Sequence, residues 1–151
     1  MHLHTRIGSA VAAVAVAAGF MAASPGTAIA GGYGCSGTLV NTWPVKSAVP
    51  NTLSNIRLYY DASTGYNCAV NVKTAYYSQF KDQTSITIMR EDWTEDDNNR
   101  PGVTIDSDSG KFSSYAGPVK IPAKGKCVMI DATTYYYDEV ARKYTGAVAC
   151  G

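Results

Sequence analysis

The amino-acid sequence predicts an all-β protein: a single-domain antiparallel β-sandwich or barrel with two disulfides, preceded by a secretory signal peptide. Three observations point to this class. From Gly31 onward, apolar and polar residues alternate with period two. Turns that contain Gly, Pro, Asn or Asp separate the alternating runs, and no run repeats apolar residues at helical spacing for three turns. Four cysteines remain in the secreted part, an even number that is typical of paired disulfides.

Residues 1–30 have the features of a signal peptide. A short segment with one firm positive charge, Arg6, precedes an apolar run over 7–23 that is rich in Ala and Val. The small-x-small pattern Ala-Ile-Ala at 28–30 then predicts cleavage after Ala30 and a mature domain over 31–151. A membrane anchor is the alternative, but the run is at the short limit for a span and only weakly hydrophobic. We therefore expect no membrane attachment after cleavage.

Strands are expected in the first half of the mature chain over 55–61, 66–77 and 84–90, where the alternation is regular. The side chains on one face of each strand are expected to point into the core. In chain order these are Ile56, Leu58, Tyr60, Cys68, Val70, Val72, Ile86 and Ile88. Those expected to point outward are Arg57, Tyr59, Asn67, Asn71, Lys73, Ser85 and Thr87.

The second half begins with a continuous apolar run over 126–130, which favours a central strand buried on both faces. Strands over 133–139 and 143–150 complete the fold, and one short helical turn within 137–144 is the alternative there. The turns are expected where Gly, Pro, Asn and Asp gather. These places are 61–65, 98–102, 117–118 and 122–125.

The four cysteines, Cys35, Cys68, Cys127 and Cys150, are widely scattered and contain no C-x-x-C pattern, which disfavours a metal site. Three pairings are compatible with two disulfides. We favour the sequential one, Cys35–Cys68 with Cys127–Cys150. The rival pairing, Cys35–Cys150 with Cys68–Cys127, would clamp both ends of the domain. Each bridge should stabilise the fold by roughly 2–4 kcal/mol.

The composition excludes several classes of function. The chain has 13 basic and 12 acidic residues, and Arg6 is the one charged side chain in 1–30, so the mature domain has no net charge and no field that would attract nucleic acid. Both histidines lie in the signal peptide, which excludes His-dependent nucleophiles and His-ligated zinc. A hydrolase would need two carboxylates facing each other across a cleft, and Asp131 and Glu139 have no evident partner. We expect no enzyme, no catalytic residue and no cofactor.

One stretch, 91–110, carries seven of the twelve acidic residues. Asp106 and Asp108 resemble the start of a calcium loop, but Lys111 stands where that loop needs Gly and Gly117 stands where it needs Glu. They remain weak calcium candidates only, and no metal is predicted. A looser site is the open alternative; it would use Asp92, Asp96, Asp97, Asp106 and Asp108. We favour a solvated hairpin loop whose charges keep a β-protein soluble.

Tyrosine is the most distinctive component, with 11 Tyr against 3 Phe, and it occurs in runs at 59–60, 76–77 and 135–137. Neighbours on a strand point to opposite faces, so one ring of each run should point away from the core. The alternation predicts that Tyr59, Tyr77 and Tyr136 point outward and form a candidate binding surface, to which Trp93 is added because its neighbours are charged. Such rings can stack on sugars or pack against proteins. The alternative is that they form cross-strand pairs.

Several stretches together resemble a known family. "GYGCSGTL" contains the first cysteine, "LYYDASTGYNCAVNVKT" the second, and "SSYAGPV" precedes the third, with "YTGAVACG" carrying the fourth. They are similar to small secreted spore-associated proteins of filamentous, spore-forming actinomycetes, over nearly the whole mature chain. The resemblance implies secretion and association with the spore or cell surface. It implies no reaction, cofactor or catalytic residue.

The function predicted from the sequence is that of a secreted, spore- or cell-surface-associated, non-catalytic protein, acting in adhesion or as an envelope component. Its expected partner is the spore or cell-wall surface, with a glycan as one candidate. A carbohydrate-binding module that uses the exposed tyrosines is the alternative. A secreted protease inhibitor is a further alternative, since the size and disulfides suit it, although no reactive loop is identifiable.

Overall fold

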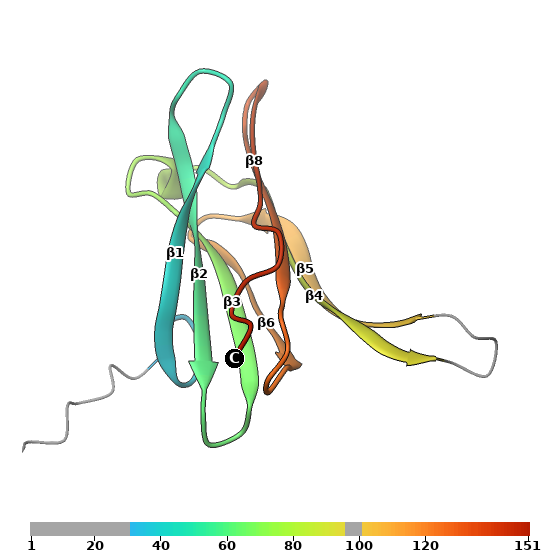
Figure 1. Cartoon of the computed structure of the whole chain (residues 1–151). Helices are drawn as coiled ribbons and strands as arrows, with labels where there is room; N and C mark the ends of the chain where they lie inside the picture. The colour runs from blue at the N-terminus through green and yellow to red at the C-terminus, as the bar shows by residue number, and fades with distance from the viewer. Residues whose placement is uncertain (1–30, 96–100) are drawn as a thin grey trace, which may run out of the picture.

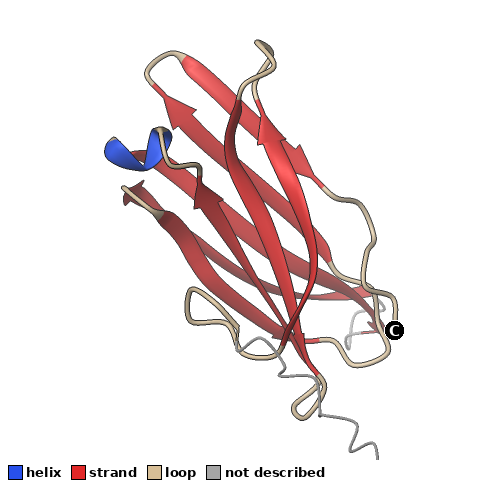
Figure 2. Ribbon diagram, turned by 90° about the vertical axis from the view of Figure 1, so that its left-hand side faces the viewer, coloured by secondary structure: helices blue, strands red, loops and turns tan. Residues whose placement is uncertain are grey.

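The computed structural model describes residues 31–95 and 101–151, with only the backbone described for 91–95, 101 and 102. The predicted signal peptide, 1–30, lies outside the described residues. Within them, eight strands form two four-stranded antiparallel sheets that pack face to face, so the predicted all-β sandwich with two disulfides is confirmed (Figure 1, Figure 2). The strands are β1 (Thr38–Lys46), β2 (Thr52–Asp61), β3 (Tyr66–Lys73), β4 (Asp82–Glu95), β5 (Pro101–Phe112), β6 (Tyr115–Pro122), β7 (Met129–Tyr136) and β8 (Glu139–Tyr144).

The first sheet has the order β1-β2-β3-β6 and the second has the order β5-β4-β7-β8. A short 3₁₀ helix, η1 (Tyr77–Gln79), lies in the connection from β3 to β4. No helix in the described part of the chain is long and apolar enough to cross a membrane. The hairpin of β4 and β5 continues past the end of β7, so that it projects from the sandwich (Figure 1).

The main core lies between the two sheets. Ile56 and Leu58 enter it from β2, and Ile86 and Ile88 enter it from β4; all four are fully buried, as the alternation predicted. Burying each such side chain contributes about 1.5–3 kcal/mol. Trp43 is partly buried and packs against the margin of this core.

The orientation predicted for β3 is wrong. Cys68 and Val70 lie on the outer face of the first sheet, and the buried Asn71 points between the sheets instead. The Asn71 amide Nδ2 donates to the Ser85 carbonyl oxygen at 3.1 Å and to Thr134 Oγ1 at 3.0 Å, both in the second sheet. These bonds satisfy the amide donors and reduce the cost of a polar residue between the sheets, although the Asn71 Oδ1 atom is buried without a partner. Period-two patterning shows that two faces differ, but not which face is covered.

A second, smaller core explains the apolar outer face of β3. Residues 31–37 run across it and are held there by the Cys35–Cys68 disulfide. Tyr59 and Val70 are buried under this segment, and the Tyr33 ring packs at its margin. The Arg57 guanidinium lies 5.2 Å from the centre of the Tyr33 ring, within cation–π range. The segment therefore acts as a cover over one face of the first sheet.

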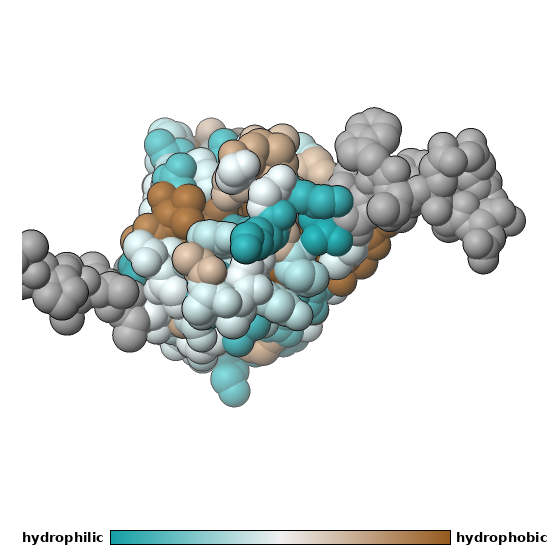
Figure 3. Space-filling view, turned by 60° about the horizontal axis from the view of Figure 1, so that its bottom comes forward, coloured by the Kyte–Doolittle hydropathy of each residue, from teal (hydrophilic) through white to brown (hydrophobic). Residues whose placement is uncertain are grey.

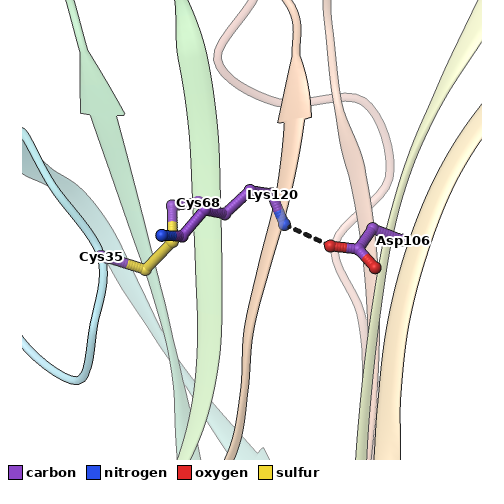
Figure 4. Close-up of a disulfide and its surroundings, with 4 residues drawn as sticks. All are labelled: Cys35, Cys68, Asp106 and Lys120. Carbon is purple, nitrogen blue, oxygen red and sulfur yellow. Dashed lines mark hydrogen bonds between the residues drawn. A yellow bond between two sulfur atoms is a disulfide. The ribbon is translucent and has the colours of Figure 1, made fainter.

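The open side between β5 and β6 is closed by two carboxylates. Asp108 Oδ2 accepts a hydrogen bond from the Gly117 amide at 2.7 Å, and Asp106 Oδ2 accepts one from the Lys120 amide at 2.7 Å. Figure 4 shows the Asp106 bond beside the disulfide, across the edge of β6. Unpaired amides on an edge strand invite pairing with another chain, and these carboxylates occupy two of them.

The C-terminal segment is tied to the second sheet. Val128 and Val148 exchange two backbone hydrogen bonds of 2.9 and 2.8 Å, and Cys127 is joined to Cys150 beside them. The disulfides thus follow the sequential pairing. On the same side of the sandwich, Ser47 forms an isolated bridge with Ala141 that links the edges of the two sheets.

Three strands were not predicted, namely β1, β5 and β6. Residues 139–144 form strand β8 rather than a helical turn, and the strand predicted over 143–150 is wrong beyond Tyr144, where β8 ends. β1 is an edge strand with only Val45 fully buried, so it lacks an apolar alternation. β5 is rich in Asp and Ser, which are depleted in strands. The turn predicted at 117–118 is wrong, because Gly117 and Pro118 lie within β6. Pro118 is tolerated there because β6 is an edge strand.

Candidate binding surface

Five aromatic side chains meet at one end of the sandwich, the upper end in Figure 1, where η1 and the β7–β8 turn lie. We call them the aromatic cluster: Tyr76, Tyr77, Phe80, Tyr136 and Tyr137. The first three belong to the β3–β4 connection and the last two to the end of β7 and the turn after it. Segments about 60 residues apart in the sequence thus build one surface.

Tyr136 lies at the centre of the cluster. Its ring centroid is 4.8 Å from that of Tyr137, 4.9 Å from that of Phe80 and 5.0 Å from that of Tyr77, all in edge-to-face geometry. Tyr76 adds a further contact with Tyr77 at 5.0 Å. Such pairs contribute about 0.5–1.5 kcal/mol each beyond the area that they bury. The five rings therefore support one another as a unit.

The cluster has a buried base and an exposed top. Tyr77 and Tyr136 are half-buried and pack against the main core. Tyr76 is 56% exposed and Tyr137 is 76% exposed, the highest value among the large apolar and aromatic side chains described. The two outer rings are therefore held in position by rings beneath them and present their surface to solvent.

The backbone around the cluster is firmly hydrogen-bonded. In the β3–β4 connection the Ser78 amide donates to the Thr74 carbonyl oxygen at 2.9 Å, and the Phe80 amide donates to the Tyr77 carbonyl oxygen at 3.2 Å. On the other side, Tyr136 pairs with Glu139, which leaves a two-residue turn of Tyr137 and Asp138. Both supporting segments are thus short and internally bonded, which restricts the positions that the rings can adopt.

Tyr137 has a left-handed backbone conformation, with φ of 50°. For a bulky residue this is an outlier that costs about 1–2 kcal/mol relative to a right-handed conformation. Tight hairpin turns need positive φ and usually use Gly, Asn or Asp for it. The chain places a tyrosine there instead, so the turn presents a large ring at the expense of backbone strain.

Two hydroxyl groups at the base of the cluster, those of Tyr77 and Tyr136, have a raised pKa and stay neutral over the physiological range. Tyr76 and Tyr136 share a hydrogen bond of 3.3 Å between their hydroxyl oxygens. This bond, together with burial, raises the pKa of Tyr136 to about 12. Burial, and to a lesser degree the charge of Glu139, also raises the pKa of Tyr77. The surface therefore offers aromatic faces with hydroxyl groups beside them, a combination suited to stacking and hydrogen bonding.

The structure corrects part of the predicted surface. The prediction that Tyr59 belongs to the exposed surface is wrong, because this side chain is only 3% exposed beneath residues 31–37. Tyr77 and Tyr136 do come together, but as the half-buried base rather than as outward rings. For Tyr136 the reason is alternation along β7, which places it on the inner face after Ala132 and Thr134. Trp93 has a side chain that lies outside the described residues.

The most exposed members, Tyr76 and Tyr137, were missed because the sequence rule treated their surroundings as strand. Tyr76 directly precedes η1 and Tyr137 lies in a turn, where period-two alternation does not apply. A signal for Tyr137 was present: the run ends at Asp138, and a residue pair joining two alternating strands predicts a tight turn.

The carboxylates proposed as alternatives have structural partners. Asp106 and Asp108 accept edge-strand amides, and no group of three potential metal ligands occurs among the residues that the structure describes. The looser calcium site would also need Asp92, Asp96 and Asp97, whose side chains lie outside the described residues. Asp131 forms an ion pair with Arg142, whose Nε donates to it at 3.0 Å. Glu139 accepts from Ser47 and, at 3.2 Å, from the Asn51 amide group.

Comparison with known proteins adds one relative. No protein-family model matches the chain, and no solved structure matches it. The chain is 28% identical over 122 residues to spore-associated protein A of Streptomyces coelicolor, a match that spans 81% of this chain and 69% of that protein. Together with the two disulfides, it fits an extracellular or spore-surface location. The chain is thus distantly similar to a spore-associated protein, in agreement with the resemblance found in its motifs.

Proposed function

We propose that this protein is a secreted, non-catalytic component of the spore or cell surface that attaches to its partner through the aromatic cluster. The observation that carries the proposal is the pair of exposed rings, Tyr76 and Tyr137, on a base of three packed rings. The distant similarity to a spore-associated protein supports the location. The structural partners of Asp106, Asp108 and Asp131 and the absence of histidine from 31–151 support a role without catalysis.

The cluster has the properties of an interaction hot spot. Tyr provides a large amphipathic contact area while losing little conformational freedom on binding, which is why it is enriched at such sites. Other exposed tyrosines, such as Tyr144, stand apart from any described ring pair and lack this support. The strained turn at Tyr137 supports the same conclusion, since strained conformations gather at functional sites.

Attachment of the purified protein to spores and to isolated cell walls of the source organism tests the proposal. Tyr76→Ala, Tyr137→Ala and the double variant should weaken attachment, each single change by about tenfold or more if the rings are hot spots. Tyr144→Ala is the matched control, because Tyr144 is 51% exposed against 56% for Tyr76. Equal attachment of the double variant and the control would refute the role of the cluster.

A glycan is the second candidate partner, and one observation favours it. The hydrogen-bonded Tyr76 and Tyr136 hydroxyls lie beside the exposed rings, so that a sugar stacked on a ring would meet hydroxyl groups able to bond with its own. Soluble cell-wall glycan fragments should then compete for attachment of the unchanged protein. If the partner is a protein instead, the fragments should have no effect, and protease treatment of the spores should abolish attachment.

A further inference from the structure

An apolar pocket lies at the end of the sandwich opposite the aromatic cluster. It has a volume of about 480 Å³, within the range of small-molecule sites, and its walls are mostly apolar. Its lining includes Val40 of β1, Tyr60 of β2, Ala123 after β6 and Ala149 near the C-terminal disulfide. Figure 3 views this end of the molecule and shows apolar surface gathered beside hydrophilic residues. We call this cavity the terminal pocket.

We propose that the terminal pocket binds a small amphiphile, with an apolar body inside the pocket and one anionic group at Lys124. Lys124 is the one charged side chain among the described residues that line the pocket. The aliphatic stem of Lys124 lies against the backbone of Gly65. A Cβ added to that glycine would lie 3.0 Å from the Lys124 Cβ and 3.6 Å from its Cγ and Cδ. The mostly apolar walls and the one charged side chain on them together indicate the ligand class.

Two departures from regular backbone geometry form the walls. Val40 is the extra residue of a β-bulge, since Leu39 pairs with Tyr59 while Asn41 pairs with Leu58. A bulge redirects a side chain and is common beside binding sites. On the opposite wall, Ala149 has φ of 51°, a left-handed conformation that costs about 1 kcal/mol or more for a residue with a Cβ.

The wall that contains Ala149 is fixed before any ligand arrives. The backbones of Val148 and Val128 exchange two hydrogen bonds, and a disulfide joins Cys150 to Cys127. The opposite wall belongs to the first sheet, where Val40 and Tyr60 lie on neighbouring strands. A preformed pocket loses little freedom on binding, which increases its affinity for a ligand. The pocket is separate from the aromatic cluster, so this inference does not depend on the proposed attachment.

Two fluorescent probes with the same apolar body separate the two parts of the proposal: the anionic 1-anilinonaphthalene-8-sulfonate and the neutral N-phenyl-1-naphthylamine. The folded protein should bind both saturably at one site, and the anionic probe more tightly. Val40→Asp puts a charge into the apolar wall and should weaken both probes by about tenfold or more. Val49→Asp, at an exposed residue in the β1–β2 connection and 63% exposed, is the control and should change neither.

Lys124→Met keeps most of the stem and removes the charge, so it should weaken the anionic probe by about fivefold and leave the neutral probe unchanged. Lys124 is exposed, so this variant gives a result even if Val40→Asp unfolds. The proposal is overturned if neither probe saturates, if Val49→Asp acts like Val40→Asp, or if Lys124→Met affects both probes alike. Loss of binding in the Tyr76→Ala/Tyr137→Ala double variant would also overturn it, by placing the probes on the aromatic cluster.

Discussion

The left-handed conformation of Tyr137 makes a prediction in which two variants differ in stability but not in attachment. Tyr137→Gly and Tyr137→Ala both remove the ring, which is 76% exposed and therefore buries little surface. The two variants differ in backbone freedom alone. Ala keeps the penalty of about 1–2 kcal/mol for φ of 50°, whereas Gly removes it. Gly also increases the conformational entropy of the unfolded chain, which lowers stability by about 0.4–1 kcal/mol. Because the relief of strain is larger than this cost, we expect Tyr137→Gly to be more stable than Tyr137→Ala by about 1 kcal/mol.

Chemical denaturation of the purified variants measures this difference directly, and a melting-temperature gap of about 4 °C should accompany it. Attachment to spores should fall equally in both variants, because both lack the ring. The stability of Tyr137→Gly should lie within about 1–2 kcal/mol of that of the unchanged protein, since relief of strain partly offsets the lost ring pairs with Tyr136 and Phe80. If Tyr137→Ala proves as stable as Tyr137→Gly, the turn is not strained, and the argument that the chain holds a ring there at a cost is wrong.

Three further predictions follow from the structure. Tyr59→Ala should lower the free energy of unfolding by about 3–5 kcal/mol, because its ring is buried in the smaller core, and should leave attachment of the folded protein unchanged; reduced attachment at unchanged stability would contradict its assignment to that core. The pKa of Tyr136, about 12, lies above the ordinary value of 10.0, so its contribution to stability is complete below pH 10 and is lost as the pH rises through 12. An ultraviolet titration should show a component that ionises near pH 12 and disappears in Tyr136→Phe. Asp108→Ala should cost about 1–2 kcal/mol by leaving the Gly117 amide without its acceptor, and calcium should not alter the melting temperature of the unchanged protein; a calcium-dependent rise lost in Asp108→Ala would show a metal site instead.

The acidic stretch shows what the sequence could and could not reveal. Its charges and serines predicted a solvated loop, yet 101–112 is strand β5. β5 lies at the edge of its sheet, and the alternate residues Asp106 and Asp108 accept amides of β6 rather than entering an apolar core. Strand propensity depends on what each face contacts, and a carboxylate that satisfies an edge strand has no recognisable apolar pattern.

The faces of the first sheet illustrate a different limit. Alternation in 55–61 correctly placed Ile56 and Leu58 together, and it also separated Tyr59 from them. It could not show that residues 31–37 return over the outer face, because that contact joins distant parts of the chain through Cys35 and Cys68. Tyr59 therefore looked exposed and is buried.

The aromatic cluster was predictable only in part. The runs of tyrosine showed that ring surface would be abundant, and Tyr77 and Tyr136 do meet. Their meeting depends on the β3–β4 connection folding back beside the β7–β8 turn, which no local pattern encodes. Which rings end outermost follows from η1 and from the left-handed turn, so Tyr76 and Tyr137 emerge only from the fold.

Hydroxyl-radical footprinting, read by mass spectrometry, tests the central claim that attachment occurs through the aromatic cluster. The protein is oxidised free in solution and again after attachment to spores, and the modification of each tyrosine is compared. Tyr144 serves as an internal reference, because it is 51% exposed and lies outside the cluster. We predict that Tyr76 and Tyr137 are protected on attachment while Tyr144 stays as reactive as before. Unchanged oxidation of Tyr76 and Tyr137 in the attached protein would contradict the account.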